Sequence, residues 1–263
     1  MKTQGTSRKT SSAGLEPNVW RETYSIRSYE VDCRNRLSIL SMFHFMQEAA
    51  SNHARSLGVS VRQLLTENYT WLLSRLKIEI ASYPGIEDSV QIATWPSGAQ
   101  RLFALRDFEL RNGRNQIIAA AVSAWLVMDV QKRRPVRIAP FVKRLKPVEH
   151  LHALPDSLDK LPGLESHTFE KKFVARYRDV DVNQHINNVS FVEWVVEGVP
   201  PSLIKTSAPV ELEINFLAEA FYGDCIVAAC QPRNQEHTVY HHSLVREQDG
   251  WELARARSVW RPL

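Results

Sequence analysis

Residues 176–189 read RYRDVDVNQHINNV, and a related stretch, RSYEVDCRNRL, occupies residues 27–37. Three pairs of equivalent residues, each separated by 149 positions, connect the two stretches: Arg27 with Arg176, Asp32 with Asp181, and Leu37 with Ile186. A repeat at a fixed period is typical of a chain that contains two copies of one structural unit. The sequence therefore predicts two related halves.

The repeat continues toward the C-terminus of each half, although its offset becomes smaller. Asp88 pairs with Asp224 at an offset of 136, and Trp125 pairs with Trp260 at an offset of 135. The first half must therefore contain about a dozen extra residues. The stretch GVSVRQLLTEN at residues 58–68 accounts for them as a short helix that the second half lacks.

Both halves have the same predicted order of a strand, a helix and several strands. In the first half we expect strands at 23–31, 69–82, 88–96, 101–111 and 116–129, with a helix at 37–57 and a hairpin turn at Asn112-Gly113. In the second half we expect strands at 169–178, 209–219, 224–232, 237–247 and 251–261, with a helix at 188–198 and a turn at Asp249-Gly250. An antiparallel sheet wrapped around one apolar helix is the compact arrangement for this order, which predicts the α+β class.

Composition restricts the class of protein. Hydrophobic residues make up 44% and charged residues 24% of the 263 residues, as in a globular protein. The apolar stretch 117–128 is too short to cross a membrane. Cys33, Cys225 and Cys230 follow no disulfide or zinc pattern, which favours a reducing compartment, and we expect a cytoplasmic protein. The first residues lack the apolar core of a secretory signal, so 1–20 is predicted to be a disordered tail, with a transit-peptide remnant as the alternative.

A basic stretch, QKRRPVRIAPFVKRLKP at 131–147, separates the halves. Its prolines argue against a regular helix, so we divide the chain into a first unit at 21–130, a basic linker at 131–168 and a second unit at 169–263. The predicted positive surface consists of Lys132, Arg133, Arg134, Arg137, Lys143, Arg144 and Lys146, with Arg101 and Arg106 as further candidates. No helix-turn-helix, zinc or RNP pattern occurs, so an acidic protein is favoured over nucleic acid as the partner.

The D-x-N-x-H pattern of Asp181, Asn183 and His185 is the strongest candidate site. Asn187 or Asn188 is predicted to cap the following helix, but a cap does not account for the three residues before it. One His and one Asp without a nearby Cys form a poor ligand set, so no metal is expected. The first half has Arg34 and Arg36 where the second has Asn183 and His185, which predicts one active site per chain.

Several motifs in order resemble the acyl-acyl carrier protein thioesterases of bacteria and plants. They are RSYEVD, QEAASNHARSLGV, WLLSRLKIEI, TWPSG with RLFALRDFEL, SAWLVMD with RRPVR, DVNQHINNV and EINFLAEAFYGD, between about residues 24 and 260. The resemblance implies a double hotdog fold, in which two antiparallel sheets each wrap around a central helix. It also implies hydrolysis of fatty acyl-acyl carrier protein to free fatty acid, which terminates chain elongation, without a cofactor.

The resemblance assigns catalytic roles to Asp181, Asn183, His185 and, in the following strand, Glu219. Tyr83 stands opposite Glu219 at offset 136. We expect His185 and Glu219 to activate water, Asn183 to orient the carbonyl or the water, and Asp181 to hold the loop. Many family members have Cys after this Glu, whereas here the residue is Ala220, which argues against a Cys-His nucleophile. A covalent route through another side chain stays an alternative.

The resemblance also implies that the acyl chain lies in the first unit. Its candidate lining residues are Met42, Phe43, Met46, Trp71 and Leu73. Acyl carrier protein is then the expected partner, and a homodimer is one option. A coenzyme A thioesterase of the same fold and a lipid-binding protein without catalysis are the two alternative functions.

Overall fold

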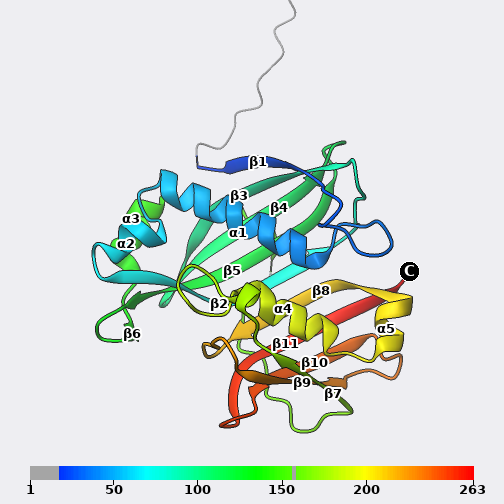
Figure 1. Ribbon diagram of the computed structural model, residues 1–263. Coiled ribbons are helices and arrows are strands. Elements are labelled where there is room, and N and C mark those ends of the chain that lie inside the picture. Colours follow the sequence, from blue (N-terminus) through cyan, green and yellow to red (C-terminus); the bar gives the residue numbers. More distant parts are fainter. Residues whose placement is uncertain (1–17, 156–157) are drawn as a thin grey trace, which may run out of the picture.

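The computed structural model describes residues 18–155 and 158–263, in which two similar halves lie side by side (Figure 1). The first half contains β1 (Trp20–Ser25), α1 (Ile39–Ser56), α2 (Val61–Leu65), β2 (Tyr69–Ile80), β3 (Ser89–Gln100), β4 (Phe103–Asn112) and β5 (Ile117–Asp129). The connection contains β6 (Arg134–Pro135) and α3 (Ala139–Leu145). The second half contains β7 (Phe169–Val174), the 3-10 turn η1 (Tyr177–Asp179), α4 (Asn188–Glu197), α5 (Pro201–Thr206), β8 (Ser207–Phe216), β9 (Cys225–Pro232), β10 (Val239–Arg246) and β11 (Trp251–Pro262).

The strands form one continuous sheet, in the order β1-β3-β4-β5-β2-β8-β11-β10-β9-β7, with β6 paired to β5. The second half repeats the strand order of the first in reverse, and β2 pairs with β8 in the middle. The predicted α+β double hotdog is confirmed, with one correction, because the two sheets are joined rather than separate. Joining β2 to β8 satisfies backbone groups that two free sheet edges would expose.

Helices α1 and α4 lie on the same face of this sheet (Figure 1). Ser38 caps α1 by accepting from the Ser41 N–H, and the buried residues of the helix follow the three- and four-residue spacing of its apolar face. Asn187 caps α4 in the same way by accepting from the Val189 N–H. One core of buried side chains runs beneath both helices.

Helix α1 of the first half corresponds to two helices in the second, α4 and α5. Gly198 ends α4, and Pro201 begins α5. A Cβ atom at Gly198 would lie 2.6 Å from the Trp194 carbonyl oxygen and 2.9 Å from the Ala228 Cβ, so the close approach requires glycine. The predicted helix at 188–198 is thus confirmed, while α5 was not expected.

The connection between the halves is more ordered than predicted. It contains the helix α3, because Pro140 falls in the first turn, where the missing N–H costs nothing, and Pro147 comes after the helix ends. Further along, Leu154 and Leu158 pack against Val122 and Ala124 of β5. The linker therefore covers one face of the sheet.

The predicted tail at 1–20 lies mostly outside the described residues. Its last residues are ordered, since Trp20 begins β1 and the Asn18 amide donates to the carbonyl oxygen of Leu145 at 2.8 Å. Within 18–155 and 158–263, no helix has the length and apolar character needed to cross a membrane. Cys33, Cys225 and Cys230 are all free thiols.

Candidate active site

Asp181 organises the loop that carries the D-x-N-x-H pattern. Its Oδ1 atom accepts from the backbone N–H groups of Asn183 at 2.8 Å and His185 at 3.3 Å, and its own N–H donates to the His185 carbonyl oxygen at 2.8 Å. Short side chains that accept backbone N–H groups in this way stabilise turns. The turn also places Gln184 in the left-handed region, at φ 63°.

The first half contains the same loop without the candidate catalytic residues. Asp32 Oδ1 accepts from the N–H groups of Arg34 at 2.9 Å and Arg36 at 3.0 Å, and Asn35 has φ 60°. Asp32 and Asp181 therefore perform the same structural task. Where the first loop has Arg34 and Arg36, the second has Asn183 and His185.

A backbone hydrogen bond that has an equivalent in the first half holds the segment of Glu219 beside this loop. The Ile186 N–H donates to the Ala220 carbonyl oxygen at 3.0 Å, and the Leu37 N–H donates to the Pro84 carbonyl oxygen at 2.7 Å. Glu219 and Tyr83 thus occupy equivalent positions, as the offset of 136 predicts. The expectation that Glu219 lies in a strand is wrong, because β8 ends at Phe216.

The structure brings His185 and Glu219 together. His185 Nδ1 lies 3.5 Å from Glu219 Oε1, and the two side chains are 41% and 38% exposed. This distance exceeds an ordinary hydrogen bond, but catalytic contacts are often loose before the substrate binds. The pair is therefore accessible to water and within reach of a closer contact.

Two neighbours of this pair were not predicted from sequence. The ring of Phe221 meets His185 edge to face, with 5.5 Å between centroids. Arg246 Nη1 donates to the Glu219 backbone carbonyl at 3.4 Å. Phe221 lies two residues after Glu219, so its place in the site could have been proposed from the sequence. Arg246 lies in β10, and no pattern in the sequence around it connects it with Glu219.

Asn183 is an exposed loop residue whose amide nitrogen contacts Asp181 Oδ2 at 3.3 Å. Across the described ranges, it makes no hydrogen bond to His185 or Glu219. The loop thus holds Asn183 two residues before His185 but directs its amide nitrogen toward Asp181.

The candidate acyl-lining residues fall into two groups. Met42, Phe43, Met46 and Leu73 are buried in the core beneath α1, which is continuous with the core beneath α4. Trp71 instead packs in a separate cluster with Phe141, and its indole N–H donates to the Val59 carbonyl oxygen at 2.8 Å. Four of the five candidates therefore lie together in the core beneath α1.

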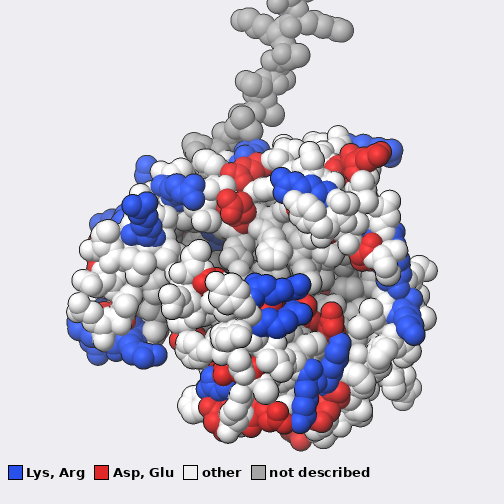
Figure 2. Space-filling model, in the orientation of Figure 1, with Lys and Arg blue, Asp and Glu red and all other residues white. Residues whose placement is uncertain are grey.

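The predicted positive surface lies around β6 and α3, at the end of the molecule where Figure 2 shows a concentration of Lys and Arg. Six of its residues are exposed: Lys132, Arg133, Arg134, Arg137, Lys143 and Lys146. Arg144 is half-buried and pairs with Glu67 at 3.0 Å. Arg106 is buried, with its Nη1 atom 3.2 Å from His53 Nδ1, so its candidacy as a surface residue is wrong.

No group of three or more His, Cys, Asp or Glu side chains that could hold a metal occurs in the part of the chain that the structure describes. An imidazole facing a carboxylate can move a proton, and N–H groups at the start of a helix can stabilise a negative charge.

Comparison with known proteins identifies the family. Residues 17–144 match the family model of the acyl-ACP thioesterase N-terminal domain, and residues 164–262 match that of the C-terminal domain. The chain therefore belongs to the acyl-ACP thioesterase family. The candidate catalytic loop and Glu219 both lie within the part that matches the C-terminal domain.

Similar proteins are known from plants. A chloroplastic acyl-[acyl-carrier-protein] hydrolase of Cuphea viscosissima is 27% identical, in a match that covers 93% of this chain and 63% of that protein. A chloroplastic dodecanoyl-[acyl-carrier-protein] hydrolase of Umbellularia californica is 28% identical, over 95% of this chain and 69% of that protein. The chain thus spans less than two thirds of the Cuphea protein.

Solved structures support the fold. The 12:0-ACP thioesterase from Umbellularia californica superposes with a TM-score of 0.85 at 26% identity, over 95% of this chain and all of that one. An acyl-ACP thioesterase from Bacteroides thetaiotaomicron superposes with a TM-score of 0.83 at 22% identity, over 92% of this chain and 98% of that one. Both therefore share the fold of this chain over most of its length.

Proposed function

We propose that this protein hydrolyses the thioester of fatty acyl-acyl carrier protein, releasing a free fatty acid and so terminating chain elongation. The observation that carries the proposal is the pair formed by His185 and Glu219, with 3.5 Å between Nδ1 and Oε1. It occurs only in the half that matches the family's C-terminal domain. The equivalent pair in the first half is Arg36 and Tyr83, in which the guanidinium lies 5.4 Å from the ring centroid and cannot act as a base.

The positions of the site residues support the following roles. Glu219 faces Nδ1 of His185 and favours the tautomer that carries its proton there, so Nε2 is the atom that takes a proton from the attacking water. Asn183 would turn its amide toward the substrate carbonyl or the water when the substrate binds. Asp181 holds the loop, and N–H groups at the start of α4 are candidates to stabilise the oxyanion.

The buried residue after Glu219 supports direct attack by water. The residue is Ala220, which has no nucleophilic atom. Cys225 is half-exposed at the start of β9, five residues further along. A covalent route would therefore have to use another side chain, such as Glu219 itself.

The acyl chain is proposed to enter the first half. Met42, Phe43 and Met46 on α1 and Leu73 on β2 would surround it, because they share the apolar core that continues beneath α4. Trp71, in the neighbouring cluster, would form the far wall. Each methylene group that such a pocket accepts contributes about 0.8 kcal/mol.

The carrier protein is proposed to dock on the positive surface around β6 and α3. Arg133, Arg134, Arg137, Lys143 and Lys146 form no ion pair within the described residues, so their charges are available to an acidic partner. A cytoplasmic location, which the three free thiols favour, and a homodimer are further parts of this proposal.

The test is release of thiol from matched substrates with the same acyl group on acyl carrier protein and on coenzyme A. The proposal predicts a higher kcat/KM for the carrier-bound substrate. A preference for coenzyme A would favour the alternative of an acyl-CoA thioesterase. Binding of fatty acid without any release would favour a lipid-binding protein.

A further inference from the structure

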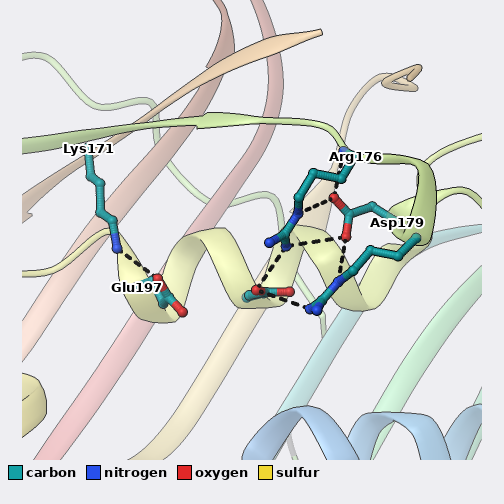
Figure 3. Close-up of polar contacts among 6 residues, drawn as sticks. Lys171, Arg176, Asp179 and Glu197 are labelled. Atoms are coloured by element: carbon teal, nitrogen blue, oxygen red, sulfur yellow. Dashed lines mark hydrogen bonds and ion pairs between the residues drawn. The ribbon is translucent and has the colours of Figure 1, made fainter. Parts of the chain in front are cut away.

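A cluster of charged residues lies against α4, beside the candidate catalytic loop, and consists of Arg176, Arg178, Asp179 and Glu193. Figure 3 shows this cluster and labels Arg176 and Asp179. Arg176 Nε lies 3.2 Å from Asp179 Oδ2, and Arg176 Nη2 lies 3.3 Å from Glu193 Oε1. Arg178 makes the same two contacts more loosely, at 3.6 Å to Asp179 and 3.8 Å to Glu193. None of these residues belongs to the chemistry described above.

Asp179 is the centre of the cluster. Its side chain is only 3% exposed, whereas those of Arg176 and Arg178 are 50% and 69% exposed. A buried carboxylate is costly unless it is paired and hydrogen-bonded. Asp179 satisfies this requirement with the two guanidinium groups and with the Arg176 backbone N–H, which donates to Oδ2 at 2.7 Å.

The backbone of Asp179 connects the cluster to the catalytic loop. Its carbonyl oxygen accepts from the Asn187 N–H at 2.8 Å, and Asn187 caps α4 two residues after His185. Residues 179–187 therefore form a closed loop whose two ends meet at this hydrogen bond. Glu193, which lies further along α4, ties the outer side of this junction to the helix through Arg176.

The first half contains a simpler version of this junction. Glu30 accepts from the Arg27 N–H at 2.8 Å and pairs with the Arg27 guanidinium at 3.6 Å, and its carbonyl oxygen accepts from the Ser38 N–H at 2.9 Å. At offset 149, however, Tyr29 replaces Arg178 and His44 replaces Glu193. The second guanidinium and the helix carboxylate therefore occur only in the half that contains His185.

We propose that Asp179, Arg176, Arg178 and Glu193 form a positioning cluster that fixes the catalytic loop on α4 and so sets the place of His185 relative to Glu219. The cluster touches no reacting atom. Its effect is on geometry, and small errors in the placement of catalytic groups cost large factors in rate. The expected effect on kcat rests on the proposed thioesterase function, whereas the expected effect on the position of the loop does not.

The test compares equivalent substitutions in the two halves. Asp179→Asn and Glu193→Gln remove charge from the cluster, while Glu30→Gln makes the matched change in the half without His185. Melting temperature, kcat and KM are measured for each, together with Glu193→Asp as the conservative variant. We expect similar losses of melting temperature for Asp179→Asn and Glu30→Gln, but a fall in kcat of about tenfold or more, at nearly constant KM, only for the two second-half variants. Glu193→Asp should recover part of the lost kcat.

Hydrogen exchange of the 180–187 backbone gives a second measurement that needs no substrate. Asp179→Asn should speed exchange there, and Glu30→Gln should leave it unchanged. If the wild-type protein is active and Asp179→Asn and Glu30→Gln have equal kcat, the inference is wrong. It is also wrong if Asp179→Asn leaves hydrogen exchange of the 180–187 backbone unchanged. A wild-type protein that releases no thiol from any acyl substrate would contradict the proposed function instead, while the exchange result would still decide the structural claim.

Discussion

Tyr83 occupies in the first half the position that Glu219 occupies in the second, and its hydroxyl donates to the backbone carbonyl of Pro209 in β8. Nearby, Arg34 Nη2 donates to the carbonyl oxygens of Ile204 at 2.8 Å and Lys205 at 2.7 Å, at the end of α5. The first-half copy of the candidate catalytic loop therefore binds the second half. The second-half copy is proposed to perform chemistry, whereas the first-half copy forms a contact between the two halves, which we call the joint.

This joint predicts that Tyr83→Phe lowers stability without lowering activity. The variant leaves the Pro209 carbonyl without its partner, a loss of about 1–3 kcal/mol, which corresponds to roughly 2–4 °C per kcal/mol in melting temperature for a chain of this size class. Turnover per folded molecule should stay close to that of the wild type. Tyr29→Phe, at an exposed tyrosine of the same half, is the control and should change neither quantity. A large loss of turnover with an unchanged melting temperature would place Tyr83 in the chemistry.

Two buried histidines predict how stability depends on pH. Burial lowers the pKa of His242 to about 3, and burial together with the nearby Arg106 guanidinium lowers the pKa of His53 to about 3. In the unfolded chain both titrate near 6.5, so between pH 6.5 and 3 the unfolded state binds more protons. Their contribution to stability is complete above about pH 6.5 and is lost as the pH falls below it, by about 1.4 kcal/mol per pH unit for each residue.

The His242 contribution can be isolated with a His242→Gln variant. Urea unfolding at pH 7 and pH 5 should show that the wild type loses about 2 kcal/mol more than the variant over this interval, since one titrating group is removed. The difference between the two proteins cancels the contributions of other groups. Equal losses in both would mean that His242 is protonated in the folded state at pH 5.

The positive surface around β6 and α3 predicts a substrate-specific effect of charge reversal. Arg133→Glu, Arg134→Glu and Arg137→Glu together should raise KM for carrier-bound substrate and weaken its dependence on salt, because electrostatic attraction speeds the encounter. A short synthetic thioester should be hydrolysed at the wild-type rate. Reversal of three exposed arginines elsewhere, Arg114, Arg233 and Arg261, controls for net charge. Equal losses on both substrates would indicate a folding defect rather than a docking surface.

The core beneath α1 predicts control of chain length. Met46→Trp should shift preference toward shorter acyl groups, because each methylene group that is blocked costs at least about 0.8 kcal/mol, and the rate on the shortest substrate should hardly change. Tyr240→Trp enlarges a buried residue of a separate cluster in the second half and tests for a general packing defect. If Met46→Trp lowers the rate uniformly at all lengths, the acyl chain binds elsewhere, with the second half beside His185 as the first place to look.

The repeat explains why much of the fold could be predicted from the sequence. Asp32 and Asp181 accept the same backbone N–H groups, and the offset of 136 correctly placed Tyr83 opposite Glu219. Local patterns also predicted a helix cap at Asn187 or Asn188, of which the structure shows Asn187, and the short helix α2. These features depend on residues close in sequence, or on two copies of one pattern.

Other features depend on how distant elements meet and could not be predicted in this way. The pairing of β2 with β8 depends on which sheet edges come together, and alternation within each strand carries no information about it. The contact of Arg246 with Glu219 and that of Arg176 with Glu193 join different elements through side chains that are ordinary in sequence. The prolines of the linker argued against a regular helix, and this prediction was wrong. Helix α3 forms there because Pro140 is favourable in the first turn of a helix.

The central claim, that catalysis belongs to the second-half loop alone, is tested most directly by thiol release from fatty acyl-acyl carrier protein with two equivalent variants. His185→Ala and Arg36→Ala change the same position in the two copies of the loop. We predict that His185→Ala loses two or more orders of magnitude in kcat, the general scale for loss of an acid-base residue, while Arg36→Ala keeps the wild-type turnover per folded molecule. A His185→Ala variant that keeps more than about half of the wild-type rate, or a comparable loss in Arg36→Ala at unchanged stability, would contradict the account.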